Sequence, residues 1–303
     1  MSQKTRAVVT GGAGFIGSHL VDALIEKGWQ VDVIDNLCAG KKEHVNKKAK
    51  LYVADIRSYE DITPIVKGAD YVFHLAALPR VQYSIDHPEE TNEVNITGTL
   101  NVLTAAKEGG VKRFIYTSSG SVYGDQDVLP LHEELPVRPA SPYGLQKYAG
   151  EAYTTLYAKL KDLPAVSLRY FNVYGSRLNV DGAYALVMGV FLKHKKEGKP
   201  LPITGDGEQT RDFTHVRDVV RANILAAEHP KLGHGEVFNI GSGNSISINA
   251  LAKLFGGSVT HVPTRPEPRN TRADNALAKR LLGWGPQVHI RDGVDELLQE
   301  WGF

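Results

Sequence analysis

A glycine-rich turn close to the amino terminus restricts this chain to few folds. Its sequence is TGGAGFIG, preceded by the apolar run Arg6–Thr10 and followed directly by a helical pattern over Phe15–Lys27. Glycines in this pattern let the turn close tightly, let the main chain approach a pyrophosphate, and let the helix pack on its strand. The positions concerned are Gly11, Gly14 and Gly17. The turn therefore predicts the first strand–helix unit of a dinucleotide-binding domain.

The rest of the first half of the chain alternates short apolar runs with longer helical patterns. Predicted strands are Gln30–Ile34, Leu51–Val53, Asp70–Leu75, Phe114–Thr117 and Ala165–Arg169, and predicted helices are Tyr59–Lys67, Asn92–Glu108 and Ser141–Lys161. Short continuous apolar runs are typical of strands buried on both faces of a parallel sheet. The alternation predicts an α/β fold with a doubly wound parallel sheet of the Rossmann type.

Beyond Tyr174 the segments shorten, and Gly and Pro become frequent. This change predicts a smaller, interleaved C-terminal domain that binds the substrate. One strand-like run, Glu236–Ile240, is apolar enough to return to the main sheet. We expect residues 1–173 to form the nucleotide-binding domain, with 211–242 returning to it, and residues 174–210 and 243–303 to form the second domain.

Composition argues against several functional classes. The chain has 35 Lys and Arg residues against 34 Asp and Glu, a net charge of +1, which gives no electrostatic footprint for nucleic acid or an anionic membrane. Its single cysteine, Cys38, excludes an intrachain disulfide, and no apolar run approaches the ~20 residues of a membrane span. With no apolar signal-peptide stretch, the sequence predicts a cytoplasmic protein without nucleic-acid or membrane partners. The dispersed histidines predict no metal site.

The end of the second predicted strand indicates which dinucleotide the turn binds. Asp35 stands there, 24 positions after Gly11. A carboxylate at this point accepts both ribose hydroxyls and repels a 2′-phosphate, so the predicted cofactor is NAD and not NADP. Asp55 and Ile56 follow the third strand, where an adenine ring can be clamped, although Asp55 could equally be a helix N-cap. Residues that suit close approach to a cofactor, or ordinary packing, end the fourth strand: Leu75, Ala76 and Ala77.

Hydroxyl groups and a Tyr-x-x-x-Lys motif indicate the chemistry. Ser118 and Ser119 come at the carboxyl end of a central strand, where ligands bind in open α/β sheets. Ser141 is predicted to be the N-cap of a helix that begins at Pro142, which places Tyr143 and Lys147 four residues apart on one face. A lysine ammonium beside a phenol favours the phenolate and lowers the phenol pKa from ~10 toward neutrality. Such a base can take a hydroxyl proton while hydride leaves the same carbon.

Together these motifs resemble the extended short-chain dehydrogenase/reductase family, in its NAD-dependent epimerase/dehydratase branch. The resemblance covers nearly the whole chain and is carried by GGAGFIG, DN, ADIR, HLAA, SSGSVYGD, SPYGLQK, RYFNVYG, GDGEQTRDF and FNIGSG. It implies that Ser119, Tyr143 and Lys147 are catalytic, with Ser118 as the alternative serine. It also implies a set of residues in contact with NAD: Gly11, Gly14, Phe15, Ile16, Gly17, Asp35, Asn36, Asp55, Ile56, Leu75, Ala76, Ala77, Asn95 and Lys147.

The resemblance also separates the reactions of this branch. Its 4,6-dehydratases carry Asp and Glu directly after the catalytic hydroxyl residue, and the related decarboxylases keep the Glu. Here those positions are Gly120 and Ser121, which cannot act as carboxylic acid or base. Asp35 disfavours an NADPH-dependent reductase. The resemblance therefore implies a UDP-sugar 4-epimerase that forms a transient 4-keto intermediate.

The resemblance also implies which residues bind the UDP-sugar and which sugar is accepted. By the resemblance, Asn172 and Arg211 hold the diphosphate and sugar together with Ser119 and Tyr143. Arg265 pairs with a second phosphate-binding arginine of the family, and Thr271 stands where a small residue admits an N-acetyl group. The stretches 75–85 and 179–187 also resemble epimerases that accept N-acetylhexosamines.

We therefore expect UDP-GlcNAc/UDP-GalNAc as the substrate pair, with UDP-glucose/UDP-galactose as a second pair. The alternatives are a UDP-glucuronate 4-epimerase or another nucleotide-sugar epimerase or dehydratase. A protein of a different class, a non-catalytic NAD sensor, is disfavoured because the serine, tyrosine and lysine are all retained. The resemblance further implies a homodimer built from the helices at Asn92–Glu108 and Ser141–Lys161.

Overall fold

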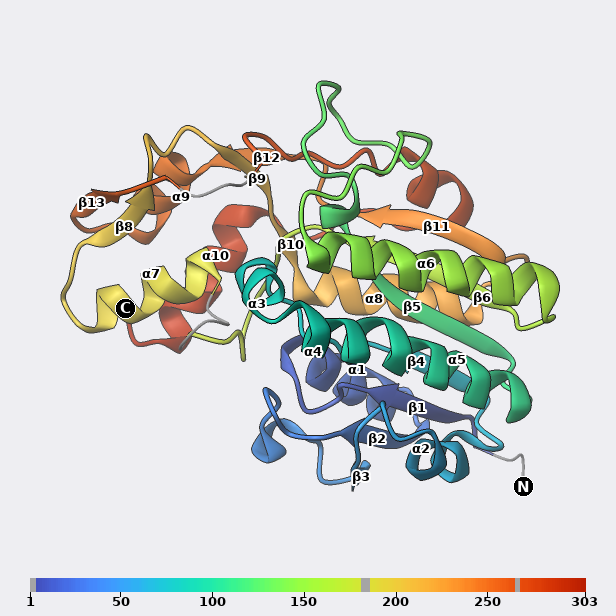
Figure 1. Ribbon diagram of the computed structural model, residues 1–303. Coiled ribbons are helices and arrows are strands. Elements are labelled where there is room, and N and C mark those ends of the chain that lie inside the picture. The colour runs from blue at the N-terminus through green and yellow to red at the C-terminus, as the bar shows by residue number, and fades with distance from the viewer. Residues whose placement is uncertain (1–3, 181–185, 265–267) are drawn as a thin grey trace.

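A computed structural model describes residues 4–180, 186–264 and 268–303. Within these ranges the larger domain is built on a seven-stranded parallel sheet of order β11-β6-β5-β4-β1-β2-β3 (Figure 1). Its strands are β1 (Arg6–Thr10), β2 (Gln30–Asp35), β3 (Lys50–Val53), β4 (Tyr71–His74), β5 (Arg113–Ser119), β6 (Ala165–Tyr170) and β11 (His234–Ile240). The predicted doubly wound sheet is confirmed, and the strand expected at Glu236–Ile240 is found in it as β11, paired with β6.

Helices cover both faces of this sheet because successive strand residues point to opposite sides. Val8 of β1 packs in the core under α2 (Tyr59–Val66), α5 (Thr99–Glu108) and α6 (Pro142–Leu160). Its neighbour Val9 packs in the other core, under α1 (Phe15–Glu26) and α8 (Val216–Glu228). In the described part of the chain, no helix is both long and apolar enough to cross a membrane.

The helix predicted over Asn92–Glu108 has a different form. It begins earlier, as α4 (Pro88–Asn92), passes through a π-helical turn at Glu93–Gly98, and continues as α5. A further short helix, α3 (Val81–Asp86), precedes it. Asn95 in the π turn is buried and faces the loop after β4. The extra residue per turn accommodates this contact, and helical periodicity in the sequence does not reveal it.

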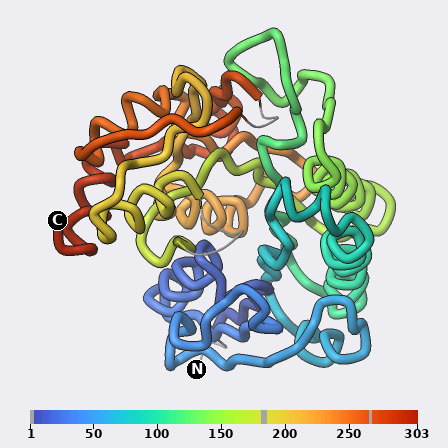
Figure 2. Tube along the Cα trace, turned by 60° about the vertical axis from the view of Figure 1, so that its left-hand side comes forward, coloured from blue at the N-terminus to red at the C-terminus, as the bar shows by residue number. Residues whose placement is uncertain are grey.

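The second domain consists of paired short strands and helices around its own core. The pairs are β7 (Val173–Tyr174) with β10 (Thr214–His215), β8 (Leu201–Thr204) with β13 (Val259–Val262), and β9 (Thr210–Asp212) with β12 (Ser245–Ser247). Its helices are α7 (Val187–Lys196), α9 (Ile248–Phe255) and α10 (Ile290–Glu300). These segments, yellow to red in Figure 2, gather largely at one side of the sheet domain. The chain enters this region after β6 and leaves it again for α8 and β11.

One close contact in the larger domain gives a test of the packing. Gly150 lies in the middle of α6, and a Cβ at this position would overlap the hydroxyl of buried Tyr116. Helix propensity alone favours Ala over Gly by about 1 kcal/mol, whereas overpacking a core costs about 1–3 kcal/mol. We therefore expect Gly150→Ala to lower the free energy of unfolding, measured by denaturant titration.

The matched control is the same substitution in a Tyr116→Phe background, where the overlapping oxygen is absent. There Gly150→Ala should cost less than in the wild type, or stabilise the protein. Equal effects of Gly150→Ala in the two backgrounds would contradict this account, because a double-mutant cycle isolates the contact between the two residues.

Candidate active site

The glycine-rich turn packs so closely that side chains are excluded from it. A Cβ at Gly17 would overlap the carbonyl oxygen of Gly11, and a Cβ at Gly11 would lie 2.7 Å from the main-chain nitrogen of Ala76. Gly11 also has a φ of +72°, which favours glycine. The N-cap of α1, Gly14, provides no capping side chain, and the first turn carries no acidic residue. The N–H groups of this turn are therefore suited to an anion such as a pyrophosphate.

Asp35 lies beside this turn at the end of β2. Its Oδ2 accepts from the main-chain N–H of Ala13 at 3.0 Å, and its Oδ1 accepts from Leu37 at 2.8 Å. Burial raises the pKa of Asp35, and these two hydrogen bonds oppose the change. Each carboxylate oxygen keeps a further lone pair, which is what two ribose hydroxyls require.

Asp55 follows β3 and accepts hydrogen bonds from two neighbouring side chains. Asn36 donates to its Oδ2 at 2.9 Å, and Arg57 donates from Nε and Nη2 at 3.0 and 2.8 Å. The hydrogen bonds from Arg57 are the main reason that the pKa of Asp55 falls to about 2. The alternative that Asp55 is a helix N-cap is wrong, since α2 begins after Ser58. Ile56 is buried and packs against Gly98 of the π turn.

A chain of hydrogen bonds through His74 connects the loop after β4 with the π turn. Ala76 N–H donates to Thr10 Oγ1, which lies 2.7 Å from His74 Nδ1, and His74 Nε2 lies 2.9 Å from Thr99 Oγ1. The Thr99 hydroxyl in turn donates to the Asn95 carbonyl at 2.8 Å. Burial lowers the pKa of His74 to about 3, so its ring is neutral and serves as one donor and one acceptor.

The side chain of Asn95 completes this support. It accepts from Leu78 N–H at 2.8 Å and donates to Leu78 O at 3.1 Å and to Gln146 Oε1 at 2.8 Å. Leu75, Ala76 and Ala77 are thus held between β1, the π turn and α6. The structure brings these predicted cofactor residues to one edge of the sheet, together with Phe15 and Ile16 in the first turn of α1.

Tyr143 and Lys147 project from α6 toward the end of β5. Ser141 caps this helix by accepting from Gly144 N–H, as its sequence predicts. Lys147 Nζ donates to the Thr117 carbonyl at 2.8 Å, and burial lowers the pKa of Lys147 to about 7. Tyr143 is buried as well, and the structure places its phenol next to Ser119.

The pKa of Tyr143 differs in direction from the sequence prediction. Burial raises it above the ordinary value, while a hydrogen bond with Ser119 and the charge of Arg80 oppose the rise. Lys147 is not among the groups that lower it. The expected lowering is wrong for the protein chain alone, because spacing along a helix predicts proximity but not the cost of burying a charge.

The two candidate serines have different environments. The Ser118 hydroxyl points toward α6 and donates to Glu151 of that helix at 2.7 Å, and Ser118 is only 1% exposed. Ser119 ends β5, and its hydroxyl accepts from Ser121 N–H at the start of a 3₁₀ turn. Only Ser119 is placed beside Tyr143, which favours it over Ser118 as the catalytic serine.

Two of the predicted substrate residues line a cavity of about 290 Å³ in the second domain. Asn172 and Arg211 line it, together with Leu178 and Phe213. Thr271 N–H donates to the carbonyl of Thr210, so Thr271 lies next to the strand that carries Arg211. Arg265 and residues 181–185 of the stretch 179–187 lie outside the described residues.

The model of the NAD dependent epimerase/dehydratase family matches residues 7–241. The chain belongs to this family. It is therefore an NAD-dependent enzyme. The site residues fit that cofactor, because no side chain enters the glycine turn and α1 starts without a side-chain cap. The end of β2 carries the Asp35 carboxylate and not a cation that could bind a 2′-phosphate.

Solved structures of family members are closely similar. The UDP-glucose 4-epimerase of Thermotoga maritima with UDP-glucose has 40% identity and a TM-score of 0.93, covering 97% of this chain and 98% of that one. The UDP-N-acetylglucosamine 4-epimerase of Methanobrevibacter ruminantium M1, with UDP-N-acetylmuramic acid, has 35% identity and a TM-score of 0.91, covering 98% and 99%. The UDP-glucose 4-epimerase of Thermus thermophilus with NAD has 33% identity and a TM-score of 0.89, covering 98% and 99%.

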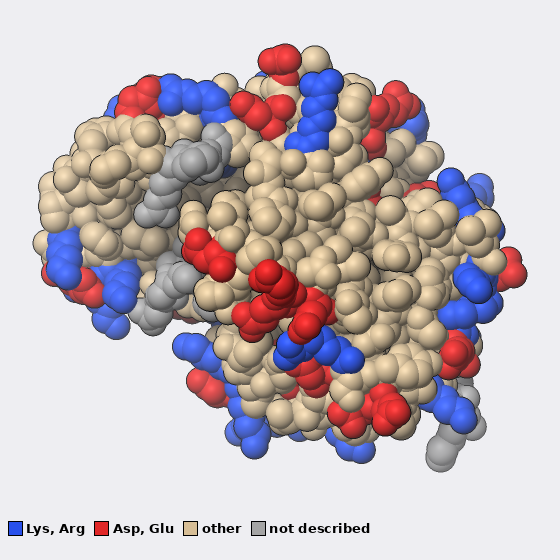
Figure 3. All heavy atoms as spheres, viewed as in Figure 1, with Lys and Arg blue, Asp and Glu red and all other residues tan. Residues whose placement is uncertain are grey.

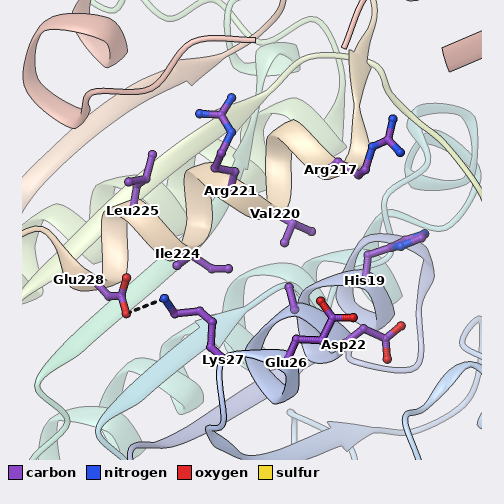
Figure 4. Close-up of a pocket in the computed structure, with 11 residues that line it drawn as sticks. His19, Asp22, Glu26, Lys27, Arg217, Val220, Arg221, Ile224, Leu225 and Glu228 are labelled. Atoms are coloured by element: carbon purple, nitrogen blue, oxygen red, sulfur yellow. Dashed lines mark ion pairs between the residues drawn. The ribbon is translucent and has the colours of Figure 1, made fainter. Parts of the chain in front are cut away.

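A larger groove, of about 630 Å³, lies on another face, between α1 and α8 (Figure 4). Ala23, Val220 and Ile224 form its apolar part. An ion pair of 3.2 Å between Lys27 and Glu228 spans one end. It does not adjoin the carboxyl ends of the strands, so we assign the chemistry to the smaller cavity and the sheet edge.

The sequence did not single out several residues that support the site. Glu151 and Gln146 are buried and hydrogen-bonded to Ser118 and Asn95, respectively. Arg169 is buried and bonded to Glu151, and Arg80 acts on the Tyr143 phenol. One signal for Glu151 was available: it follows Lys147 by four residues on the face of α6 that must be buried. No comparable signal marks Arg169 in its strand.

Proposed function

We propose that this family member is a UDP-sugar 4-epimerase, with UDP-GlcNAc/UDP-GalNAc as its main substrate pair and UDP-glucose/UDP-galactose as a second. The main support for this type of reaction is the composition of the turn after Ser119. Gly120 and Ser121 occupy it, and a Cβ at Gly120 would lie 3.1 Å from the ring of Phe171. Neither residue is one of the two carboxylates that elimination of water requires, whereas epimerisation at C4 needs none.

Relatives support the same reaction and leave the sugar between two pairs. The Thermotoga protein is named for UDP-glucose, and the Methanobrevibacter protein for UDP-N-acetylglucosamine. By the family resemblance, Thr271 stands where a small side chain leaves room for an acetamido group and a tyrosine fills it, and this favours the acetamido pair. A pocket that admits the larger group does not exclude the smaller one.

The residues of the site divide the reaction between them. NAD, when bound, supplies the acceptor for the C4 hydrogen with its electron pair and later its donor. Tyr143 takes the proton of the C4 hydroxyl and returns it after the 4-keto sugar has turned over. Ser119 hydrogen-bonds with the same oxygen, and Lys147, in its protonated form, stabilises the phenolate once NAD and substrate are bound. Nothing is consumed, because the proton and the hydride both return to the sugar.

The second domain fixes the nucleotide half of the substrate. Arg211 can bind a diphosphate oxygen pair with its planar guanidinium, and Asn172 can donate from its amide. Asn172 adopts a φ of +28° and donates to the carbonyl of Asp212 at 3.0 Å, which fixes its orientation at the cavity wall. We propose that the diphosphate lies between these two side chains.

The decisive experiment is an epimerisation assay on purified protein, followed by proton NMR without added NAD. UDP-GlcNAc, UDP-GalNAc, UDP-glucose, UDP-galactose and UDP-glucuronate are supplied separately. We expect interconversion of the acetamido pair, slower turnover of the hexose pair, and a loss of at least about a hundredfold in Tyr143→Phe. Turnover of UDP-glucuronate alone would favour the uronate epimerase, and no turnover of any sugar, even with NAD supplied, would refute the proposal.

Thr271→Tyr tests the assignment of the sugar. The larger side chain should fill the space for the acetamido group, so that turnover of UDP-GlcNAc falls by about tenfold to two-hundredfold while UDP-glucose is still epimerised. Thr271→Ser is the control and should leave both activities near the wild-type level. Equal losses on both sugars in Thr271→Tyr would show that this position does not select the sugar.

We also propose a homodimer through α5 and α6. Figure 3 shows a broad surface without charged side chains over these helices. Large apolar side chains of α6 are exposed to solvent: Leu145, Tyr148, Tyr153, Leu156 and Leu160. An apolar surface of this kind on a folded domain is typical of an interface between subunits.

Leu156→Glu should weaken this dimer, because it places a charge on the exposed apolar stripe of α6. The expected result is a monomer, or a dimer dissociating at higher concentration, in analytical ultracentrifugation. Leu281→Glu is the matched control, since Leu281 is 42% exposed and lies on another part of the chain. A wild-type protein that sediments as a monomer would contradict the proposal.

A further inference from the structure

A buried ion pair connects β6 with α6, the helix that carries Tyr143 and Lys147. The side chains of Arg169 on β6 and Glu151 on α6 are each 4% exposed. The guanidinium donates from Nε and Nη2 to the two carboxylate oxygens at 2.8 and 2.6 Å, a bidentate arrangement. Burial by itself lowers the pKa of Arg169, but the hydrogen bonds and charge of Glu151 raise it above the ordinary value. The guanidinium therefore stays charged.

The pair is bonded to three other elements. Ser118 of β5 donates to Glu151 Oε2 at 2.7 Å. Arg169 Nη1 donates to the hydroxyl of Tyr123 at 2.7 Å, and this hydroxyl donates to Asn239 of β11 at 2.8 Å. All of these side chains are buried. The pair thus connects α6, β5 and β6 with β11 and with the turn that follows Ser119.

The position of Glu151 relates it to the site. Tyr143, Lys147 and Glu151 recur every four residues along α6 and so share one face of the helix. Ser118, which Glu151 binds, is adjacent to Ser119 on β5. One carboxylate therefore fixes the helix that carries the tyrosine and lysine against the strand that carries the catalytic serine.

The pair also cancels its own charge close to groups that are sensitive to charge. Along the helix axis, Glu151 lies about 12 Å from Tyr143 and about 6 Å from Lys147. Once Glu151 loses its charge, the uncompensated charge is that of Arg169, which is bonded to the Glu151 carboxylate. With an effective dielectric constant of ~20, a unit charge at about 12 Å changes a pKa by about one unit. Four other titratable or charged side chains interact electrostatically with Tyr143, Lys147 or the ion pair: Arg80, Tyr116, His74 and Glu133.

We infer that the Glu151–Arg169 pair is a positioning device for the proposed epimerase reaction. It holds Ser119 in register with Tyr143 and Lys147 without touching the substrate, and it adds no net charge beside them. The catalytic consequence rests on the proposed function. The electrostatic part can be measured without any sugar.

Glu151→Gln tests the charge balance. Gln keeps the length of the side chain and an acceptor for Ser118, but it leaves Arg169 without its anion. We expect the pKa of the Tyr143 phenol in the NAD-loaded protein to fall by about one unit. The readout is the pH midpoint of tyrosinate absorbance, taken as the difference between each protein and the same protein carrying Tyr143→Phe.

Two further variants separate charge from geometry. Combining Glu151→Gln with Arg169→Met removes both charges, so the midpoint should return to the wild-type value. Arg169→Lys keeps the charge but loses the bidentate contact, so the midpoint should stay while kcat falls between about tenfold and a hundredfold. KM for the UDP-sugar should change little, because neither residue contacts it. Arg169→Lys also serves if Glu151→Gln does not fold.

The matched control is Asp32→Asn. Asp32 is a buried carboxylate with an ion pair of 2.7 Å to Arg6, at the start of β1 and therefore at the opposite edge of the sheet. Breaking this pair should lower stability without moving the Tyr143 midpoint. An equal shift in Asp32→Asn and Glu151→Gln would show a general effect of destabilisation and overturn the inference.

An unchanged midpoint in folded Glu151→Gln overturns the electrostatic part, and wild-type kcat in Arg169→Lys overturns the positioning part. A wild-type protein that epimerises no UDP-sugar refutes the proposed function, and the tyrosinate titration then still decides whether the pair controls the charge at Tyr143.

Discussion

The close packing of the first strand–helix turn is the constraint on which the site depends. A side chain at Gly17 would overlap the Gly11 carbonyl, and one at Gly11 would press on the main chain of Ala76. Because no side chain separates these segments, the N–H groups of α1 face the edge of the sheet, and Asp35 and the loop after β4 are held against the same turn. Main-chain packing therefore sets much of the geometry of cofactor recognition, which explains why glycine positions carry so much information in this sequence.

Charge is scarce beside the reacting groups. Lys147 is buried with a pKa of about 7, His74 is neutral, and Arg169 and Glu151 cancel each other. A new charge in such buried surroundings is screened less than it is at the protein surface. A charged ligand arriving at this edge therefore acts strongly on Tyr143. The raised phenol pKa of the protein chain alone and the phenolate that the proposed reaction requires are thus two states of one site, separated by what is bound there.

What could be predicted from the sequence was what depends on neighbours along the chain. Strands buried on both faces are apolar runs, Ser141 caps its helix from three residues away, and the glycine turn has a fixed spacing. The π turn was not predictable, because it depends on Asn95 reaching residues of two other elements. Arg169 looks like any residue of a strand until β6 is placed against α6. The direction of the Tyr143 pKa was missed for a related reason: burial is a property of the packed fold and not of a four-residue interval.

The strand order has a consequence for how the protein can be made. β11, His234–Ile240, completes the sheet beside β6 only after the chain has passed through much of the second domain. During synthesis β6 therefore presents an unpaired edge until this late strand has left the ribosome, and unpaired edges are sites of aggregation. Any fragment that ends before residue 234 keeps that edge open permanently. A cut that leaves the sheet whole must fall after Ile240, so the amino-terminal piece always carries the segments of the second domain that precede β11.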